Sequence, residues 1–242
     1  MKTTRNKVLI ITAHPDDAEL MFGGTINKYA QNGYIVNVLV VSSGENWNKL
    51  GITGTNVVKD IREAESRESM KILGVSEVSF LRMKDGLVDE KELIPVLIEE
   101  IRKADPNIIF THSQSEGHQD HKEINLAVRR VCNRIEEPTP ISNPFWDCKE
   151  NPATNFVALY THRFSSERIN SMTRYVSLTK KNIEKKIEAI QCHKSQFCNK
   201  EEVSDKVITE LHFNGIKFGV EYAEVFNLID QISLHNREIL IN

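Results

Sequence analysis

The sequence is poor in cysteine and has no long apolar run. Its 242 residues include four cysteines, none of them in a C-x-x-C pair: Cys132, Cys148, Cys192 and Cys198. So few thiols exclude the disulfide framework of a small secreted domain, and we expect them to be reduced in a cytoplasmic protein. No run approaches the ~20 apolar residues that a membrane span requires, and residues 1–7 lack the apolar core of a signal peptide.

An excess of charge of one sign is also missing. The chain has 31 lysine and arginine residues against 34 aspartate and glutamate residues, a net charge of −3. This balance provides no general attraction for nucleic acid or for an anionic membrane. A hydrophobic fraction of 40% and a charged fraction of 27% are typical of one large globular domain.

Apolar runs alternate with amphipathic segments in the first part of the chain. The expected strands are residues 8–13, 34–41, 78–81 and 107–111. The expected helices are residues 17–32, 57–73, 90–103 and 120–137. Gly33 and Gly74 stand where a left-handed residue ends a helix. The alternation predicts an α/β fold, Rossmann-like, with a mainly parallel sheet flanked by helices.

The pattern loosens after Pro138, where several prolines mark a long connection. Further strands are expected at 156–160 and 174–178, and helices after Thr179 and at 201–211, while 222–228 fits either a strand or a helix. We therefore expect one domain over 1–242. Its α/β core is residues 1–137, and 138–242 is a C-terminal elaboration that shapes the ligand pocket.

Ionisable side chains cluster where two of the expected strands end. His14, Asp16 and Asp17 directly follow the first strand, and the segment 116–121 follows the strand 107–111 and opens a helix. The carboxyl ends of parallel strands lie at one edge of a sheet, where ligands bind. We therefore expect the two clusters to meet.

Three of these residues fit a metal site. His14 and Asp17 are three positions apart across a turn, and His121 lies on the apolar, inward stripe of its helix, three positions before Ile124. Two close ligands and a distant third are a common plan for a catalytic zinc site with one position open to water. We expect one Zn²⁺ per chain, with Fe²⁺ as the alternative ion.

Three further residues then remain beside the metal. Zinc lowers the pKa of its water to roughly 7, and Asp16 is placed to act as the general base on that water. A protonated His118 is expected to stabilise the oxyanion and to protonate the leaving amine. Asp120 is expected to hydrogen-bond His118 and keep it cationic. The chemistry predicted is amide hydrolysis without a covalent enzyme intermediate.

A structural interpretation competes with this one. Asp16 with Glu19, and Asp120 with Glu123, have nearly the spacing of capping boxes, in which the carboxylates only begin helices. The coincidence of three histidines with four carboxylates (Glu116 included) at two turns favours the metal site.

The two clusters resemble the motifs of the PIG-L/LmbE-like family of zinc-dependent N-acetylglucosaminyl deacetylases. Residues 13–19, followed by Gly23-Gly24-Thr25, match A-H-P-D-D-x-E and G-G-T, and residues 118–121 match H-x-D-H. The resemblance implies zinc on His14, Asp17 and His121, a base at Asp16, and a charged pair at His118 and Asp120.

Weaker matches extend the resemblance over most of the chain: 43–45, Arg62 and Glu65, Asp85-Gly86, 193–196 and 223–226. It implies that Glu45, Arg62 and Asp85 hold the sugar or its substituent, and Glu116 stands where some relatives have Tyr or Asp. Plainer roles are a pair between Arg62 and Glu65, a turn at Asp85-Gly86, and close helix packing at Gly23-Gly24. The remaining histidines are expected to be ordinary residues: His112, His162, His212 and His235.

The function expected is removal of the acetyl group from an N-acetylated, GlcNAc-like amino sugar or its conjugate. The partners are this small molecule and no nucleic acid, and a homo-oligomer is compatible with the sequence. Three alternatives stay open. They are an amidase acting on another sugar or thiol conjugate, an Fe(II) oxygenase that uses two His and one carboxylate as a facial triad, and a non-catalytic sugar-binding protein.

Overall fold

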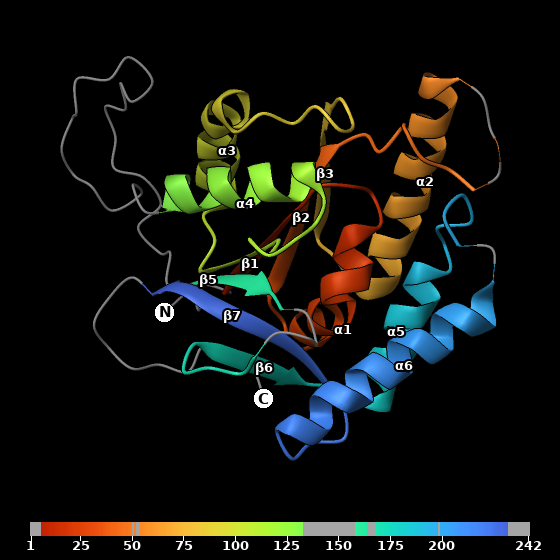
Figure 1. Cartoon of the computed structure of the whole chain (residues 1–242), viewed down its shortest axis with the longest axis vertical. Helices are drawn as coiled ribbons and strands as arrows, with labels where there is room; N and C mark the ends of the chain where they lie inside the picture. The colour runs from red at the N-terminus through yellow and green to blue at the C-terminus, as the bar shows by residue number, and fades with distance from the viewer. Residues whose placement is uncertain are drawn as a thin grey trace.

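Seven strands form one sheet in the order β3-β2-β1-β4-β5-β7-β6 (Figure 1). The computed structural model describes residues 6–49, 51, 54–132, 158–163, 168–197 and 199–231. The strands are β1 (Lys7–Thr12), β2 (Ile35–Ser42), β3 (Glu77–Met83), β4 (Ile108–Thr111), β5 (Ala158–His162), β6 (Thr173–Ser177) and β7 (Ala223–Gln231). The helices are α1 (Asp17–Gln31), α2 (Thr55–Leu73), α3 (Glu90–Ala104), α4 (Gln119–Cys132), α5 (Lys180–Ile190) and α6 (Lys200–Lys217).

The first five strands of this order pair in parallel, which confirms the predicted α/β fold. Strand β7 pairs antiparallel with both β5 and β6, so the segment 222–228 that fitted either state is a strand. Its short apolar run carries no signal of direction. Strands β5, β7 and β6 extend the same sheet, so the later part of the chain builds onto the core rather than standing apart.

Two apolar layers enclose the sheet because successive strand residues point to opposite faces. Val8 and Ile10 of β1 join the layer formed with α1, α2, α5 and α6, whereas Leu9 and Ile11 join the layer formed with α3 and α4. Figure 1 shows α3 and α4 on one side of the sheet and α1 with α5 on the other. Burial on both faces explains why β1 reads as a continuous apolar run.

The predicted helix ends and the close packing at the glycines are confirmed. Gly33 and Gly74 follow α1 and α2 with φ of 81° and 83°, in the left-handed region that glycine adopts at low cost. A Cβ on Gly23 would lie 2.9 Å from Lys186 Cγ of α5, and the Gly24 N–H donates to Glu224 Oε1 at 2.9 Å. Glycine at both positions therefore lets α1 approach α5 and β7.

Some expected features lie outside the described residues: 133–137 of the fourth helix, 156–157 of the fifth strand, His235, Cys148 and Cys198. Cys192 is a free thiol, and Cys132 is buried in the layer formed with α3 and α4. Among the helices described, none combines the length and apolar character needed to cross a membrane.

The sheet brings the two ionisable clusters to one edge. Ile10 of β1 pairs with Phe110 of β4 in parallel register, and the cluster after each strand follows within a few residues. Both clusters then open a helix, α1 or α4, whose N-terminus lies at the same edge. The fold thus juxtaposes residues about a hundred positions apart.

Candidate metal centre and active site

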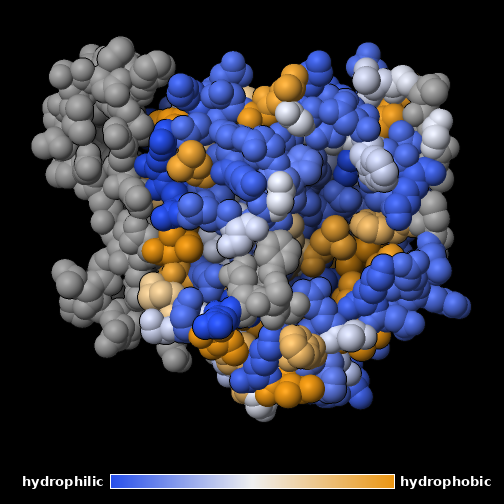
Figure 2. Space-filling view, in the orientation of Figure 1, coloured by the Kyte–Doolittle hydropathy of each residue, from blue (hydrophilic) through white to orange (hydrophobic). Residues whose placement is uncertain are grey.

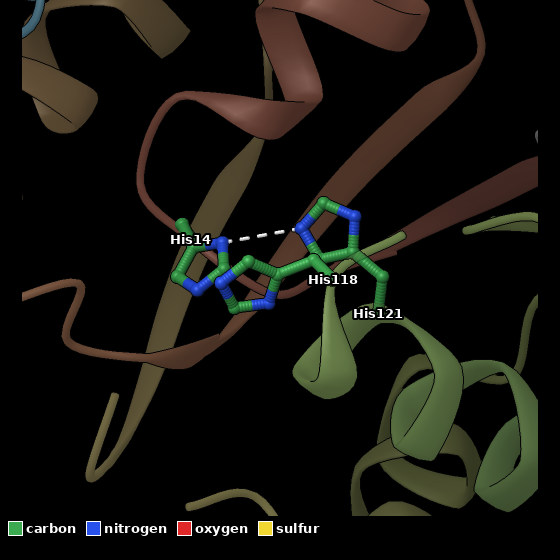
Figure 3. Close-up of side chains that lie close together, drawn as sticks. All are labelled: His14, His118 and His121. Carbon is green, nitrogen blue, oxygen red and sulfur yellow. Dashed lines mark hydrogen bonds between the residues drawn. The ribbon is translucent and has the colours of Figure 1, made fainter. Parts of the chain in front are cut away.

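Three side-chain atoms from the two clusters form a nearly equilateral triangle. His14 Nδ1 lies 3.2 Å from Asp17 Oδ2 and 3.2 Å from His121 Nε2, and the latter two atoms are 3.3 Å apart. All three residues are less than 9% exposed. Figure 3 shows the His14 and His121 rings facing one another, with His118 beside them.

The triangle fits a zinc ion of ordinary coordination. Ligand atoms about 2.0–2.1 Å from a tetrahedral zinc are about 3.3 Å from one another, which is the spacing found here. Two imidazole nitrogens and one carboxylate oxygen are also ligands that zinc accepts, and they leave the fourth position open. The donor set and its spacing therefore suit the metal predicted from the sequence.

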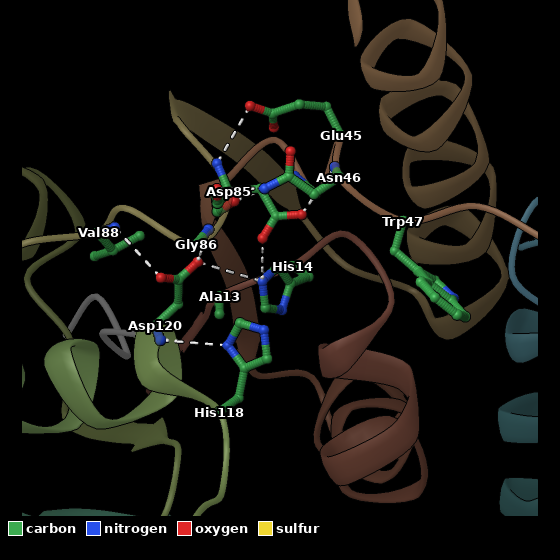
Figure 4. A network of polar contacts seen from close by, with 12 residues as sticks. Ala13, His14, Glu45, Asn46, Trp47, Asp85, Gly86, Val88, His118 and Asp120 are labelled. Atoms are coloured by element: carbon green, nitrogen blue, oxygen red, sulfur yellow. Dashed lines mark hydrogen bonds and ion pairs between the residues drawn. The ribbon is translucent and has the colours of Figure 1, made fainter. Parts of the chain in front are cut away.

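Carboxylates surround His14 on its other side. Its Nε2 lies 3.1 Å from Asp85 Oδ1 and 3.5 Å from Asp120 Oδ2 (Figure 4). Burial alone would lower the pKa of His14, but its hydrogen bonds with Asp120, Asp17 and Asp85 raise it to about 12. The concentration of buried negative charge favours a cation at this point.

The far nitrogen of His121 likewise faces a carboxylate. His121 Nδ1 lies 3.2 Å from Glu116 Oε2, and Glu116 is 7% exposed. Burial lowers the pKa of His121, but Asp17 and Glu116 outweigh it and raise the value to about 9. A carboxylate on the far nitrogen of each histidine is the arrangement that orients metal-bound imidazoles.

His112 belongs to this centre, although its place directly after β4 is the only sequence feature that points to it. Its ring stacks on His121 with centroids 3.8 Å apart, and its Nε2 accepts a hydrogen bond from the Ala13 N–H at 2.8 Å. Burial holds its pKa well below the usual value, so the ring is neutral. His112 Nε2 lies 3.5 Å from Asp17 Oδ2, but its lone pair is already engaged, and His112 therefore supports the centre instead of offering a ligand.

Asp16 is held by Arg62, and the alternative role of Arg62, a pair with Glu65, is wrong. Arg62 Nη2 lies 2.8 Å from Asp16 Oδ1, while its Nη1 donates to the Gly44 carbonyl. Glu65 accepts hydrogen bonds instead from the Ser195 N–H at 2.9 Å and its hydroxyl at 2.6 Å. Arg62 is 3% exposed, so this ion pair is shielded from solvent.

The alternative in which Asp16 and Asp120 only cap helices is wrong for both residues. Asp16 precedes α1 but makes no side-chain capping hydrogen bond, and Asp17 Oδ2 accepts from the His14 N–H at 2.7 Å. Asp120 accepts from Gly86 and Val88 N–H groups at 2.8 and 3.3 Å, which lie before α3 rather than in α4. These carboxylates bind groups of other elements at the sheet edge and do not cap the helices that they begin.

The expected hydrogen bond from His118 to the Asp120 carboxylate is also wrong. His118 Nδ1 instead accepts from the backbone N–H of Asp120 at 3.3 Å. This contact leaves Nε2 as the nitrogen that carries the proton of the neutral ring. Burial and the neighbouring His14 and His121 lower the pKa of His118, which is exposed at the surface of the centre.

Two further residues expected at a sugar, Glu45 and Asp85, contact one another. The Asp85 N–H donates to Glu45 Oε1 at 3.2 Å, and Asp85 Oδ2 accepts from the Asn46 N–H at 3.0 Å (Figure 4). The predicted turn is confirmed, since Leu87 N–H bonds to the Lys84 carbonyl and Gly86 has φ of 77°. The turn fixes Asp85 against His14 and ties the loop after β2 to the centre.

Comparison with known proteins identifies similar chains. A family model described as PIG-L: GlcNAc-PI de-N-acetylase matches residues 9–132. The probable N-acetyl-alpha-D-glucosaminyl L-malate deacetylase 2 of Bacillus anthracis is 25% identical over 234 residues, covering 93% of this chain and 94% of that protein. Diacetylchitobiose deacetylase of Thermococcus kodakarensis is 28% identical over 245 residues, covering 95% and 85%. The solved N,N'-diacetylchitobiose deacetylase of Pyrococcus horikoshii has a TM-score of 0.80 at 26% identity, covering 93% of this chain and 84% of that one.

Proposed function

Because the chain belongs to the PIG-L (GlcNAc-PI de-N-acetylase) family, we propose that it is a metal-dependent hydrolase that deacetylates an N-acetylated amino sugar or its conjugate. The three similar proteins named above are deacetylases by name, which supports hydrolytic deacetylation. One observation carries the proposal. The triangle formed by His14, Asp17 and His121 lies beside a carboxylate, Asp16, that does not belong to it.

We assign the metal to the three atoms of that triangle. His14 Nδ1, Asp17 Oδ2 and His121 Nε2 would hold one zinc ion, which would supply Lewis acidity to a water molecule and to the acetamide carbonyl. Asp85 orients His14 by hydrogen bonding to its far nitrogen, and Glu116 orients His121 by forming an ion pair with its far nitrogen. Asp85 thus acts on the centre in this scheme, which differs from a direct role in holding the sugar.

The base in this scheme is Asp16. Arg62 occupies its Oδ1, and Oδ2 has no hydrogen-bond partner among the described residues. Oδ2 is therefore left to accept a proton from the attacking water. Arg62 holds the carboxylate in place because it is itself anchored on the Gly44 carbonyl.

His118 is the hydrogen-bond donor to the oxyanion in this scheme. Its Nδ1 is occupied by the Asp120 N–H, so the Nε2–H of the neutral ring is available to stabilise the developing charge. The proton that Asp16 accepts from the water then reaches the leaving nitrogen. The water oxygen bonds to the acyl carbon first, and the C–N bond of the amide breaks when the leaving nitrogen receives a proton. One amide and one water give acetate and the free amine of the sugar, and no bond to the enzyme forms.

An amine-release assay tests this function. The substrates are N-acetylglucosamine and its simple glycosides, nucleotide conjugates and acid conjugates, with zinc content measured in each protein sample. We expect release of amine and acetate in equal amounts by the wild-type protein. Asp16→Asn should keep the zinc and lose about 10²–10⁴-fold in kcat. Wild-type activity in Asp16→Asn at saturating zinc would refute the base assignment, and amine release by a zinc-free protein would refute the metal.

A further inference from the structure

A cavity of about 530 Å³ lies between α1, α6 and β7, close to the metal centre. This volume is within the range of about 300–1,000 Å³ that is typical of small-molecule sites. Apolar side chains from separate elements line it, among them Leu20, Met21, Phe197, Val203, Val207 and Val225. Figure 2 shows apolar surface in the hollow between α1 and α6, framed by polar residues.

Two pairs of oppositely charged residues in the lining contact one another. Lys186 Nζ donates to Glu224 Oε1 at 2.6 Å on the inner wall, and both side chains are less than 5% exposed. At the outer rim Lys206 Nζ lies 2.5 Å from Glu202 Oε1. The lining also includes Lys49, Arg163 and Glu210, so an apolar occupant is expected to contact the apolar side chains of the cavity.

Two lining residues lie near the metal centre. Leu20 of α1 is four positions after Asp16, a rise of about 6 Å in a helix. His162 ends β5, and its Nδ1 is 4.0 Å from Oε1 of Glu116, the residue that contacts His121. The cavity therefore lies at the same edge of the sheet as the metal centre.

The loop after β2 forms a rim between the metal centre and the cavity. Its residue Asn46 bonds to Asp85 beside His14, and its residue Lys49 lines the cavity. The loop is tied to the segment before α6 by Gln196 Nε2, which donates to the Trp47 carbonyl at 3.0 Å. Trp47 is 63% exposed and its ring turns away from the Asp85 cluster in Figure 4, so the rim offers an aromatic side chain to a sugar.

We propose that this cavity is a subsite for an apolar aglycone, the group on the anomeric oxygen of the substrate; this rests on the proposed deacetylase function. The acetamide then lies at the metal centre, the sugar passes the Trp47 rim, and the aglycone is buried between α1 and α6. The chain would favour N-acetylglucosaminides of alkyl or aryl alcohols over the free sugar.

The test is a series of N-acetylglucosaminides with methyl, butyl and hexyl aglycones. Burial of each methylene group is expected to raise kcat/KM about fourfold until the cavity is filled. Equal kcat/KM for the methyl and hexyl compounds in the wild-type protein would overturn the subsite.

Two substitutions on α6 locate the effect. Val203→Asp places a charge in the cavity and should lower the hexyl-to-methyl ratio of kcat/KM at least about tenfold. Ile208→Asp is the matched control, because Ile208 is 38% exposed on the same helix and does not line the cavity. If Val203→Asp fails to fold, Val203→Phe fills the cavity with apolar atoms and should lower the same ratio. A ratio that falls equally in Ile208→Asp, or in neither variant at position 203, would contradict the location.

The subsite can be tested separately from the deacetylase function. If no glycoside releases amine, the function is wrong, and calorimetric binding of hexyl and methyl β-D-glucoside still tests the cavity. Hexyl glucoside should bind at least about tenfold more tightly to the wild-type protein than methyl glucoside does. Equal affinities would refute the subsite on their own.

Discussion

Glu116 Oε2 lies 3.2 Å from Nδ1 of His121, and both residues are buried. The contact fixes the imidazole so that its Nε2 faces His14 and Asp17. A carboxylate in this position also makes the imidazole a stronger ligand. Glu116 is therefore expected to act on metal affinity through His121, without contact to the metal.

Glu116→Gln should weaken zinc binding about 10–100-fold, since the neutral amide removes the negative charge that makes His121 a stronger ligand. The measurement is competition with a chromogenic chelator, supported by the absorption spectrum of the cobalt-substituted protein. Glu123→Gln, on α4 and away from the ligands, is the control. Unchanged zinc affinity in Glu116→Gln would show that Glu116 is only a packing residue.

Arg62→Lys should reduce kcat about 10–100-fold, because one ammonium group cannot hold Asp16 and the Gly44 carbonyl together. Arg67→Lys, an exposed change on the same helix, should have little effect. In an Asp16→Asn background the Arg62 change should cost much less, since both act on one proton transfer. Full additivity of the two losses in kcat, or a change confined to KM, would instead place Arg62 on the substrate.

The spacing of apolar residues predicted most of the helices and strands, and the ionisable residues after two strands predicted the metal centre. A buried strand is a continuous apolar run, and an amphipathic helix repeats its apolar residues at helical spacing. The elements β1, α1, β4 and α4 could therefore be located from the sequence. Because parallel strands end at one edge, the meeting of His14, Asp17 and His121 could also be predicted.

The pairing partners of the charged residues in the metal centre could not be predicted from the spacing of residues in the sequence. Arg62 with Asp16, and Asp120 with the N–H groups of Gly86 and Val88, are pairs set by how α2 and the loop before α3 approach the sheet edge. Sequence spacing describes one element at a time and favoured local alternatives, namely a helical pair and two capping boxes. The local alternatives are wrong because these buried charges are paired across elements at the sheet edge, which sequence spacing does not show.

Zinc removal should lower the thermal stability of the wild-type protein. A ligand that binds only the folded state adds about 4 kcal/mol at a free concentration 1,000 times its Kd. For a chain of this size, each kcal/mol corresponds to roughly 2–4 °C in Tm. Calorimetry with zinc or with a chelator measures the difference. Asp17→Asn should lose this response because its carboxylate supplies one corner of the triangle, and an equal response in that variant would exclude Asp17 as a ligand.

Glu19 and His193 should make folding stability depend on pH. His193 Nε2 lies 2.7 Å from Glu19 Oε1, both side chains are fully buried, and Ser69 donates to the same oxygen. Burial favours the neutral imidazole, but the charge of Glu19 and its hydrogen bond outweigh this and raise the pKa of His193. The folded protein therefore holds its proton to higher pH than the unfolded chain, whose histidine has a pKa of about 6.5.

The stabilisation from this pair is fully present below about pH 6.5 and is lost as the pH rises through the raised pKa of the folded state. Glu19→Gln removes the charge that raises this pKa, and should abolish the loss. The measurement is the free energy of unfolding in urea from pH 6 to 9, compared between the two proteins so that other titrating groups cancel. His212→Gln, at an exposed histidine of α6, should leave the profile unchanged. Parallel profiles for the wild-type protein and Glu19→Gln would mean that His193 is neutral in the folded state.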